Sequence, residues 1–229
     1  MHTNIKKWTF AFVIVCFAHH LNAQNQSTGN WFIYFGNQAI NKKWNWWNEV
    51  QYRNYNFAGD LEQLMLRTGI GYNLTENNNN LLLGYAHIIS APYIAGTNTK
   101  TNTTEERLYQ QFITKQNFGR FFLQHRYRLE ERFLSSGEFK ARFRYFLSIN
   151  IAINKPSIVN NTFYFSAYNE FFLNFKSPVF DRDRLYGAVG YALTDKLRLE
   201  TGYMIQMYEK QNRPQFQLVF MNNLPIHNK

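Results

Sequence analysis

The stretch RFFLQHRYRLEERF, residues 120–133, alternates between two kinds of side chain. Its odd positions are mostly aromatic or aliphatic, whereas its even positions are mostly polar and include Arg126, Arg128 and Arg132. Successive side chains of a β-strand point to opposite faces, so one face of this segment is apolar and the other is basic. The pattern predicts a long β-strand.

The same arrangement recurs directly downstream. The segment ARFRYFLSINIAI, residues 141–153, sets Arg142 and Arg144 against an aromatic and aliphatic face, and Ser135 to Gly137 supply turn residues before it. The two segments therefore resemble a β-hairpin. Weaker versions run along the rest of the chain, which gives about eleven candidate strands.

The length of these segments decides the fold class. They run to about ten to fourteen residues, against about five or six for an ordinary globular strand, and about nine to eleven tilted residues cross the hydrocarbon layer. We predict an all-β fold: a closed antiparallel transmembrane β-barrel. Because such barrels have even strand numbers, we expect ten strands, or alternatively twelve, with Trp31 to Phe35 as an extra or misread element.

The connections differ in length. Tight turns are expected at Asn41 to Lys43, Lys115 to Asn117 and Thr194 to Lys196, whereas Ser90 to Glu105 forms a long polar loop. Outer-membrane barrels have short periplasmic turns and longer external loops, which places Ser90 to Glu105 outside the cell.

The first residues indicate export. Lys6 and Lys7 precede an apolar run from Trp8 to Ala18, and a small-residue cleavage pattern ends at Ala23. We therefore expect residues 1–23 to be a cleaved signal peptide and residues 24–229 to be one barrel domain in the bacterial outer membrane. The single cysteine, Cys16, lies in the signal, which leaves no disulfide and no cysteine-zinc site.

The net charge of +10 falls to +8 without Lys6 and Lys7, which favours anionic partners. For an exported chain these are outer-membrane lipid and lipopolysaccharide, with small anionic solutes as a further class and nucleic acid excluded. Aromatic residues make up 18% of the chain, and amphipathic rings suit membrane interfaces. Interfacial girdles are expected from Trp44, Trp46, Trp47, Tyr55, Tyr72, Tyr164 and Tyr191.

The polar strand faces supply the candidate site, a lumen lined with charge. An open basic wall would make a narrow anion-biased channel. The favoured alternative is that Glu49, Glu130, Glu170 and Glu200 neutralise the arginines through bidentate pairs in a narrow interior. The residues expected to face the lumen are Glu49, Arg53, Arg67, Arg120, Arg126, Arg128, Glu130, Arg132, Arg142, Arg144, Glu170, Arg184, Arg198 and Glu200.

Two other functions stay open. A lipid-modifying outer-membrane hydrolase would draw on His87, His125, Ser148 and Ser166, because it needs a serine nucleophile near an oriented histidine. A soluble periplasmic β-barrel would turn its apolar face inward. We favour a barrel without enzymatic activity, and since the histidines are far apart in sequence we expect no metal or other cofactor.

Several segments together resemble a known family. They are the Trp-rich stretch from Trp31 to Arg53, HRYRLEERF at 125–133, RFRY at 142–145, YNEFF at 168–172 and RLYGAVGY at 184–191. The chain resembles a family of predicted outer-membrane proteins known as domain of unknown function number 2490. The resemblance implies a β-barrel in the bacterial outer membrane, and it supplies no substrate and no functional residue.

Overall fold

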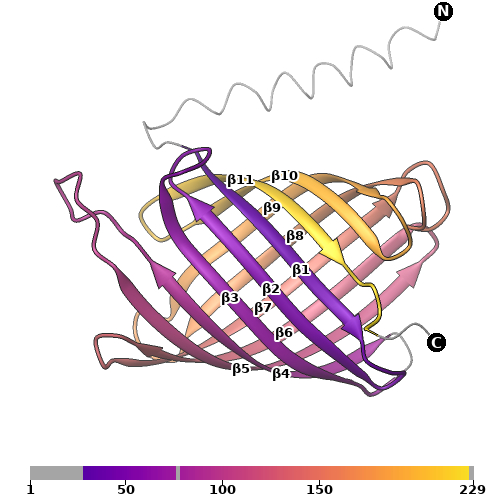
Figure 1. The fold of residues 1–229 in the computed structure, drawn as a ribbon, viewed down its shortest axis with the longest axis horizontal. Coiled ribbons are helices and arrows are strands. Elements are labelled where there is room, and N and C mark those ends of the chain that lie inside the picture. The colour runs from indigo at the N-terminus through magenta and orange to yellow at the C-terminus, as the bar shows by residue number, and fades with distance from the viewer. Residues whose placement is uncertain (1–27, 76–77, 227–229) are drawn as a thin grey trace, which may run out of the picture.

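The computed structural model describes residues 28–75 and 78–226, where eleven long strands form one closed barrel (Figure 1). The predicted signal peptide, residues 1–23, lies outside the described residues. Within the described ranges no helix is long and apolar enough to cross a membrane. The strands are β1 (Gly29–Ala39), β2 (Trp44–Asn54), β3 (Leu61–Asn73), β4 (Asn79–Ser90), β5 (Thr103–Phe118), β6 (Phe121–Leu134), β7 (Phe139–Ala152), β8 (Thr162–Asn174), β9 (Phe180–Ala192), β10 (Leu197–Met207) and β11 (Asn212–Asn222).

Consecutive strands pair antiparallel around the barrel, and one parallel pair closes it. β1 and β11 run in the same direction, with Gly29 opposite Gln215 and Gly36 opposite Asn222 (Figure 1). The expectation of ten or twelve strands was therefore wrong, and the segment Trp31 to Phe35 is part of β1. Closure needs every backbone group at the two edges to find a partner, and a parallel ladder meets that need as an antiparallel one does.

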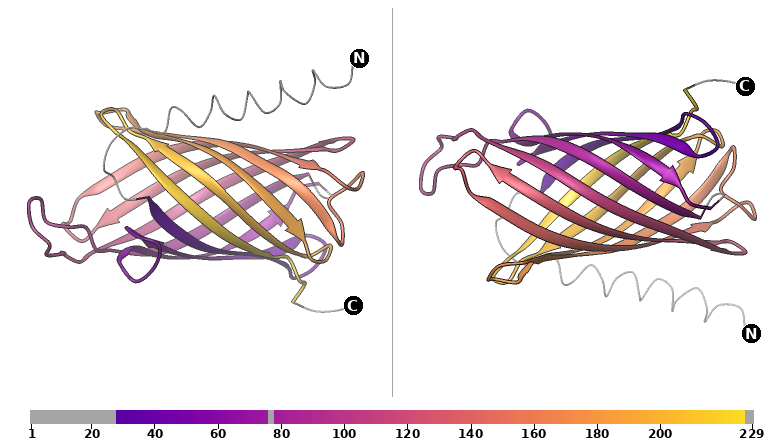
Figure 2. Two further views of the ribbon diagram at one scale, coloured as in Figure 1. Left: turned by 90° about the horizontal axis from the view of Figure 1, so that it is seen from above. Right: turned by 90° about the horizontal axis from the view of Figure 1, so that it is seen from below.

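The barrel has two rims, which we name after the strand ends they contain. The Gly29 rim holds the start of β1 and the longest connection, residues 91–102; the Asn222 rim holds the end of β11 (Figure 2). The two-residue turn of the Asn222 rim is Gly119 and Arg120, with Gly119 at φ 58°. A tight turn was expected at Lys115 to Asn117, but these residues continue β5.

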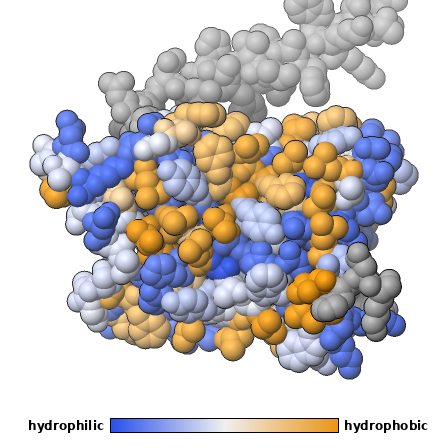
Figure 3. Space-filling model, in the orientation of Figure 1, coloured by the Kyte–Doolittle hydropathy of each residue, from blue (hydrophilic) through white to orange (hydrophobic). Residues whose placement is uncertain are grey.

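The barrel wall is apolar outside and polar inside. Leu83 on β4 and Phe165 on β8 expose 63% and 54% of their surfaces, whereas Arg128 and Glu130 on β6 expose 1% each. Apolar residues spread over the wall in Figure 3, and hydrophilic ones gather at its two ends. Charged side chains are therefore buried inside the barrel, whereas in most globular proteins they lie at the surface.

Two aromatic residues expected in an outer girdle point inward instead. Trp47 packs against Phe35 in the lumen, with ring centroids 5.6 Å apart. Tyr164 is buried over Gly190, where an added Cβ would lie 2.1 Å from the tyrosine ring. The strand alternation places both on the inner face, so their aromatic character was a poorer guide than their position.

Candidate functional site

The interior contains a cluster of ion pairs that we call the charged plug. Its centre is Glu130, which accepts hydrogen bonds from Arg142 at 2.6 Å, Arg144 at 2.5 Å and Arg107 at 3.5 Å. Arg128 lies 3.6 Å from the same carboxylate. The plug comprises Glu130, Glu170, Arg107, Arg126, Arg128, Arg142, Arg144 and Arg184.

A second carboxylate extends the plug across the lumen. Glu170 on β8 accepts hydrogen bonds from Arg126 at 2.6 Å, Arg144 at 2.5 Å and Arg184 at 3.4 Å. Arg144 therefore joins the two carboxylates, and strands β5 to β9 are bridged through one network. Charge-assisted bonds of this kind are the strong ones, and each buried charge here has a partner of opposite sign.

Aromatic rings pack against the flat guanidinium groups of the interior. Phe172 lies 4.5 Å from the guanidinium carbons of both Arg144 and Arg184. Trp31 on β1 lies 3.7 Å from that of Arg53. Stacking of this type suits arginine, whose planar group is weakly hydrated. The rings fill space between charges, so this part of the lumen is packed.

The pairing differs in detail from the one expected. Glu130 and Glu170 each serve several arginines, and Glu200 accepts a hydrogen bond from Tyr186 at 2.9 Å. A bidentate geometry with both carboxylate oxygens is found at Glu105, which lies in β5 and not in the loop predicted from Ser90 to Glu105. Arg107 and Arg132 each donate two hydrogen bonds to Glu105, at distances from 2.5 to 3.1 Å.

The structure places all the residues expected at the lumen on the inner side except Arg120. Arg120 is in the turn between β5 and β6, where it donates a hydrogen bond to the Ile153 carbonyl at 2.7 Å. Arg107 was missed, although Glu105, Arg107, Tyr109 and Gln111 alternate with outward residues along β5. That two-residue period was the available signal.

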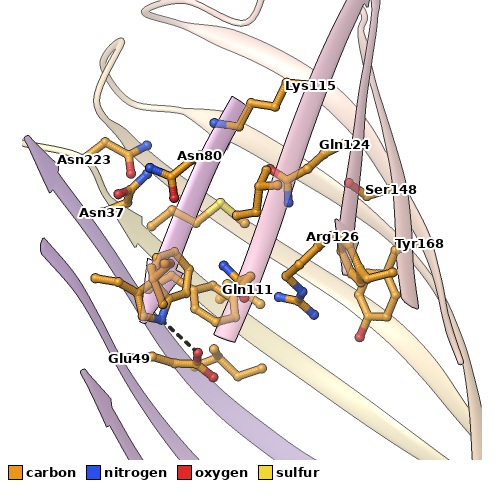
Figure 4. A pocket seen from close by; sticks show the side chains of 18 of the residues that line it. Asn37, Glu49, Asn80, Gln111, Lys115, Gln124, Arg126, Ser148, Tyr168 and Asn223 are labelled. Atoms are coloured by element: carbon orange, nitrogen blue, oxygen red, sulfur yellow. Dashed lines mark hydrogen bonds between the residues drawn. The ribbon is translucent and has the colours of Figure 1, made fainter. Parts of the chain in front are cut away.

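Beside the plug, the lumen is hollow along the inner faces of β1 and β2. A cavity of about 680 Å³, which we call the cup, opens at the Asn222 rim. Figure 4 shows Lys115 reaching into it toward Asn80, with Arg126 and Tyr168 on the opposite side. The charged residues of its lining are Lys42, Glu49, Arg53, Arg67, Lys115, Arg126, Arg144, Glu170, Arg184, Lys196 and Glu200.

An asparagine ladder forms one wall of the cup. Asn45 donates to Asn37 at 2.7 Å, and Asn80 donates to Asn45 and Asn73 at 2.8 Å each. The ladder crosses β1 to β4. It depends on Gly71, where an added Cβ would lie 2.3 Å from the Asn45 side-chain oxygen. The wall is thereby polar without carrying charge.

Three lysines of the cup lack a carboxylate. Lys42, Lys115 and Lys196 line the cavity, and none of them takes part in an ion pair with the described residues. The three carboxylates of the lining are already engaged: Glu170 by arginines, Glu49 by Arg67 and Glu200 by Tyr186. The cup therefore carries an excess of positive charge.

A separate polar cluster lies in the loops of the Gly29 rim. Lys100 and Tyr93 both hydrogen-bond to Asp60, the tyrosine at 3.0 Å. Slight burial raises the pKa of Asp60, but the hydrogen bonds from Lys100 and Tyr93 outweigh it and lower that pKa. Nearby, Arg213 forms a two-oxygen pair with Glu62. The Asp60 contacts join loop residues 55–60 to loop residues 91–102, and the Arg213–Glu62 pair joins β11 to β3.

The residues considered for a hydrolase are not brought together. His125 faces outward and its Nδ1 is 2.9 Å from the Tyr145 hydroxyl, whereas Ser148 and Ser166 face inward and are 8% exposed. His87 also faces outward, with Nδ1 2.6 Å from Glu106. Residues 28–75 and 78–226 contain no group of three or more metal-ligating side chains.

A family model described as Protein of unknown function (DUF2490) matches residues 28–217. This confirms the resemblance found in the sequence, and the match runs from the start of the barrel into β11. No curated protein and no solved structure matches the chain.

Proposed function

The chain belongs to the family Protein of unknown function (DUF2490), and from its geometry we propose that it is an integral outer-membrane β-barrel that acts by contact or binding, without enzymatic activity and without an open pore. The observation that carries the proposal is the inverted wall. Large aliphatic and aromatic residues face out around the barrel, and most of its strand arginines and glutamates, among them Arg128, Glu130 and Arg144, face in. That distribution suits a hydrocarbon surrounding.

Strand length and closure support the same proposal. The strands have 11 to 16 residues, enough for a tilted strand to cross a bilayer. All eleven pair on both sides, so the barrel has no open edge. An unpaired backbone group in lipid costs several kcal/mol, and a closed barrel avoids that cost.

The charged plug favours a closed lumen over an anion channel. Arg128, Glu130, Arg144 and Glu170 are buried, and Phe172 is packed among the arginines. Moving an ion past them would require breaking ion pairs that hold each other in place. We accordingly expect no conductance when purified protein is added to a planar bilayer. A steady anion current would contradict this part of the proposal.

Location is tested by fractionation. The protein is expected to sediment with outer membranes, to resist carbonate extraction and to need detergent for release. Recovery as a freely soluble periplasmic protein would favour the soluble-barrel alternative. A lipid-modifying activity would appear as an altered acyl pattern in cells that carry the protein, compared with cells that lack it.

Sidedness is tested by two matched cysteine variants. Ser136 lies in the β6–β7 turn at the Gly29 rim and Asn41 in the β1–β2 turn at the Asn222 rim; both are exposed. With the longest loop outside the cell, a membrane-impermeant thiol reagent added to intact cells is expected to label Ser136→Cys and spare Asn41→Cys. The opposite result would invert the orientation.

A further inference from the structure

We infer that the cup is a binding site for a small organic anion whose uncharged part carries hydroxyl groups. The inference names the class of ligand for the proposed binding role, and it therefore rests on the proposed function. The side of the membrane from which the ligand enters follows from the proposed orientation of the barrel. The cavity itself is a property of the fold. Its volume of about 680 Å³ lies within the range of about 300 to 1,000 Å³ typical of small-molecule sites.

The charge of the lining selects an anion. Eight of its side chains are cationic and three are carboxylates, and those carboxylates already have donors within the barrel. The lysines at 42, 115 and 196 remain without a carboxylate partner in the described part of the chain. They come from three separate places around the Asn222 rim, so an anion inside the cup would meet positive charge from several sides.

Two arginines of the lining hold buried donors that lack acceptors among the described residues. The side chain of Arg67 is only 5% exposed, and its Nε has no hydrogen-bond partner among the described residues. The same is true of the Nε of Arg126, whose other end donates to Glu170 while its guanidinium carbon lies 4.4 Å from the Phe146 ring. Both side chains line the cavity, and their positive charge adds to its attraction for an anion.

The uncharged lining selects the rest of the ligand. The asparagine ladder, Gln124 and Ser148 offer amide and hydroxyl groups that can both donate and accept, as hydroxyl groups of a ligand require. Next to Asn37 and Asn45 on the same two strands, the Phe35–Trp47 ring pair gives an apolar surface. A ligand with a charged end, a hydroxylated body and C–H faces would use all three features. Phosphorylated sugars and sugar acids have that chemistry.

The test is isothermal titration of the purified barrel protein in a zwitterionic detergent that contains no sugar. The probes are glucose 6-phosphate, glucuronate, inorganic phosphate and glucose. We expect saturable binding of at least one of the two sugar anions, with glucose and inorganic phosphate at least about tenfold weaker, since each lacks one half of the recognised chemistry. Absence of saturable binding by both sugar anions, or equal binding of glucose, would overturn the inference.

Variants assign the binding to the cup. Lys115→Gln is expected to weaken binding of the sugar anion about tenfold, because it removes one charged contact and touches no ion pair of the plug. The matched control is Lys176→Gln, an exposed lysine in the β8–β9 turn at the opposite rim, which is expected to leave binding unchanged. Equal affinity in wild type and in Lys115→Gln would place the anion elsewhere and overturn the inference.

Chemical protection gives a second readout. Bound ligand is expected to slow acetylation of Lys115 without affecting Lys176, as followed by mass spectrometry. These measurements are separate from fractionation and conductance. A barrel that sediments with outer membranes but binds no sugar anion defeats only the cup inference, and a soluble barrel that binds one defeats only the outer-membrane proposal.

Discussion

The two halves of the lumen share one wall and differ in what fills it. In the charged plug, long arginines meet glutamates and aromatic rings, and each hub carboxylate serves at least three guanidinium groups. In the cup, asparagine, glutamine and serine line open space, and the three lysines have no carboxylate partner among the described residues. Side-chain size and charge matching, and not barrel width alone, therefore decide whether a lumen is closed.

The largest expected effect comes from removing a hub of the plug. Glu130→Gln keeps the side-chain shape but leaves Arg107, Arg142 and Arg144 without their shared charge, which is expected to cost about 3–5 kcal/mol of unfolding free energy. Urea unfolding in lipid vesicles, followed by tryptophan fluorescence, measures it.

The control for that prediction is Glu138→Gln in the β6–β7 turn, where the carboxylate pairs with Lys140 in solvent. An exposed pair contributes about 0–1 kcal/mol, so little change is expected. If the two variants had the same free energy of unfolding, the ion pairs of the charged plug would not be what stabilises the closed part of the lumen.

An intermediate effect is expected in the wall of the cup. Gly71→Ala would drive a methyl group into the Asn45 side chain and disturb the ladder, at a cost of about 1–3 kcal/mol. Gly187→Ala on β9 is the matched control, because an added Cβ there meets nothing within 4 Å. The same unfolding assay compares them, and similar stabilities would show that the ladder does not depend on close approach at Gly71.

The smallest effect concerns the ion pair between Asp60 and Lys100, which lies in the loops of the Gly29 rim, outside both the plug and the cup. The pKa of Asp60 is lowered in the folded protein. The contact therefore contributes its full stabilisation at a pH above the unfolded-state pKa, and this contribution is lost as the pH falls through the folded-state pKa. NMR titration of the Asp60 carboxyl is expected to give a lower midpoint in wild type than in Lys100→Met. Lys210→Met, in an exposed turn of the same rim, should leave the midpoint unchanged.

Local alternation predicted the wall well, because each strand carries its own two-residue period. The facing of Arg126 and Arg128 in β6, and of Arg142 and Arg144 in β7, follows from position alone. The way in which the barrel closes could not be predicted in this manner, because the pairing of β1 with β11 joins residues far apart in the chain and leaves no local signal.

The residue types of the candidate site could be predicted from the sequence, but which residues pair with one another could not. Glu130 and Glu170 could be assigned to the lumen, but which arginines each one binds depends on register between neighbouring strands. The asparagine ladder likewise combines residues of four strands, and no one of those segments indicates it.

The parallel seam between β1 and β11 has a consequence for topogenesis. The first and last strands run the same way, so the polypeptide leaves the barrel at Gly29 by one rim and at Asn222 by the other. For a barrel embedded in a bilayer, epitope tags fused at the two ends would lie in different aqueous compartments. One terminus must then be translocated during insertion, a step that hairpin-by-hairpin assembly with both ends on one side does not require.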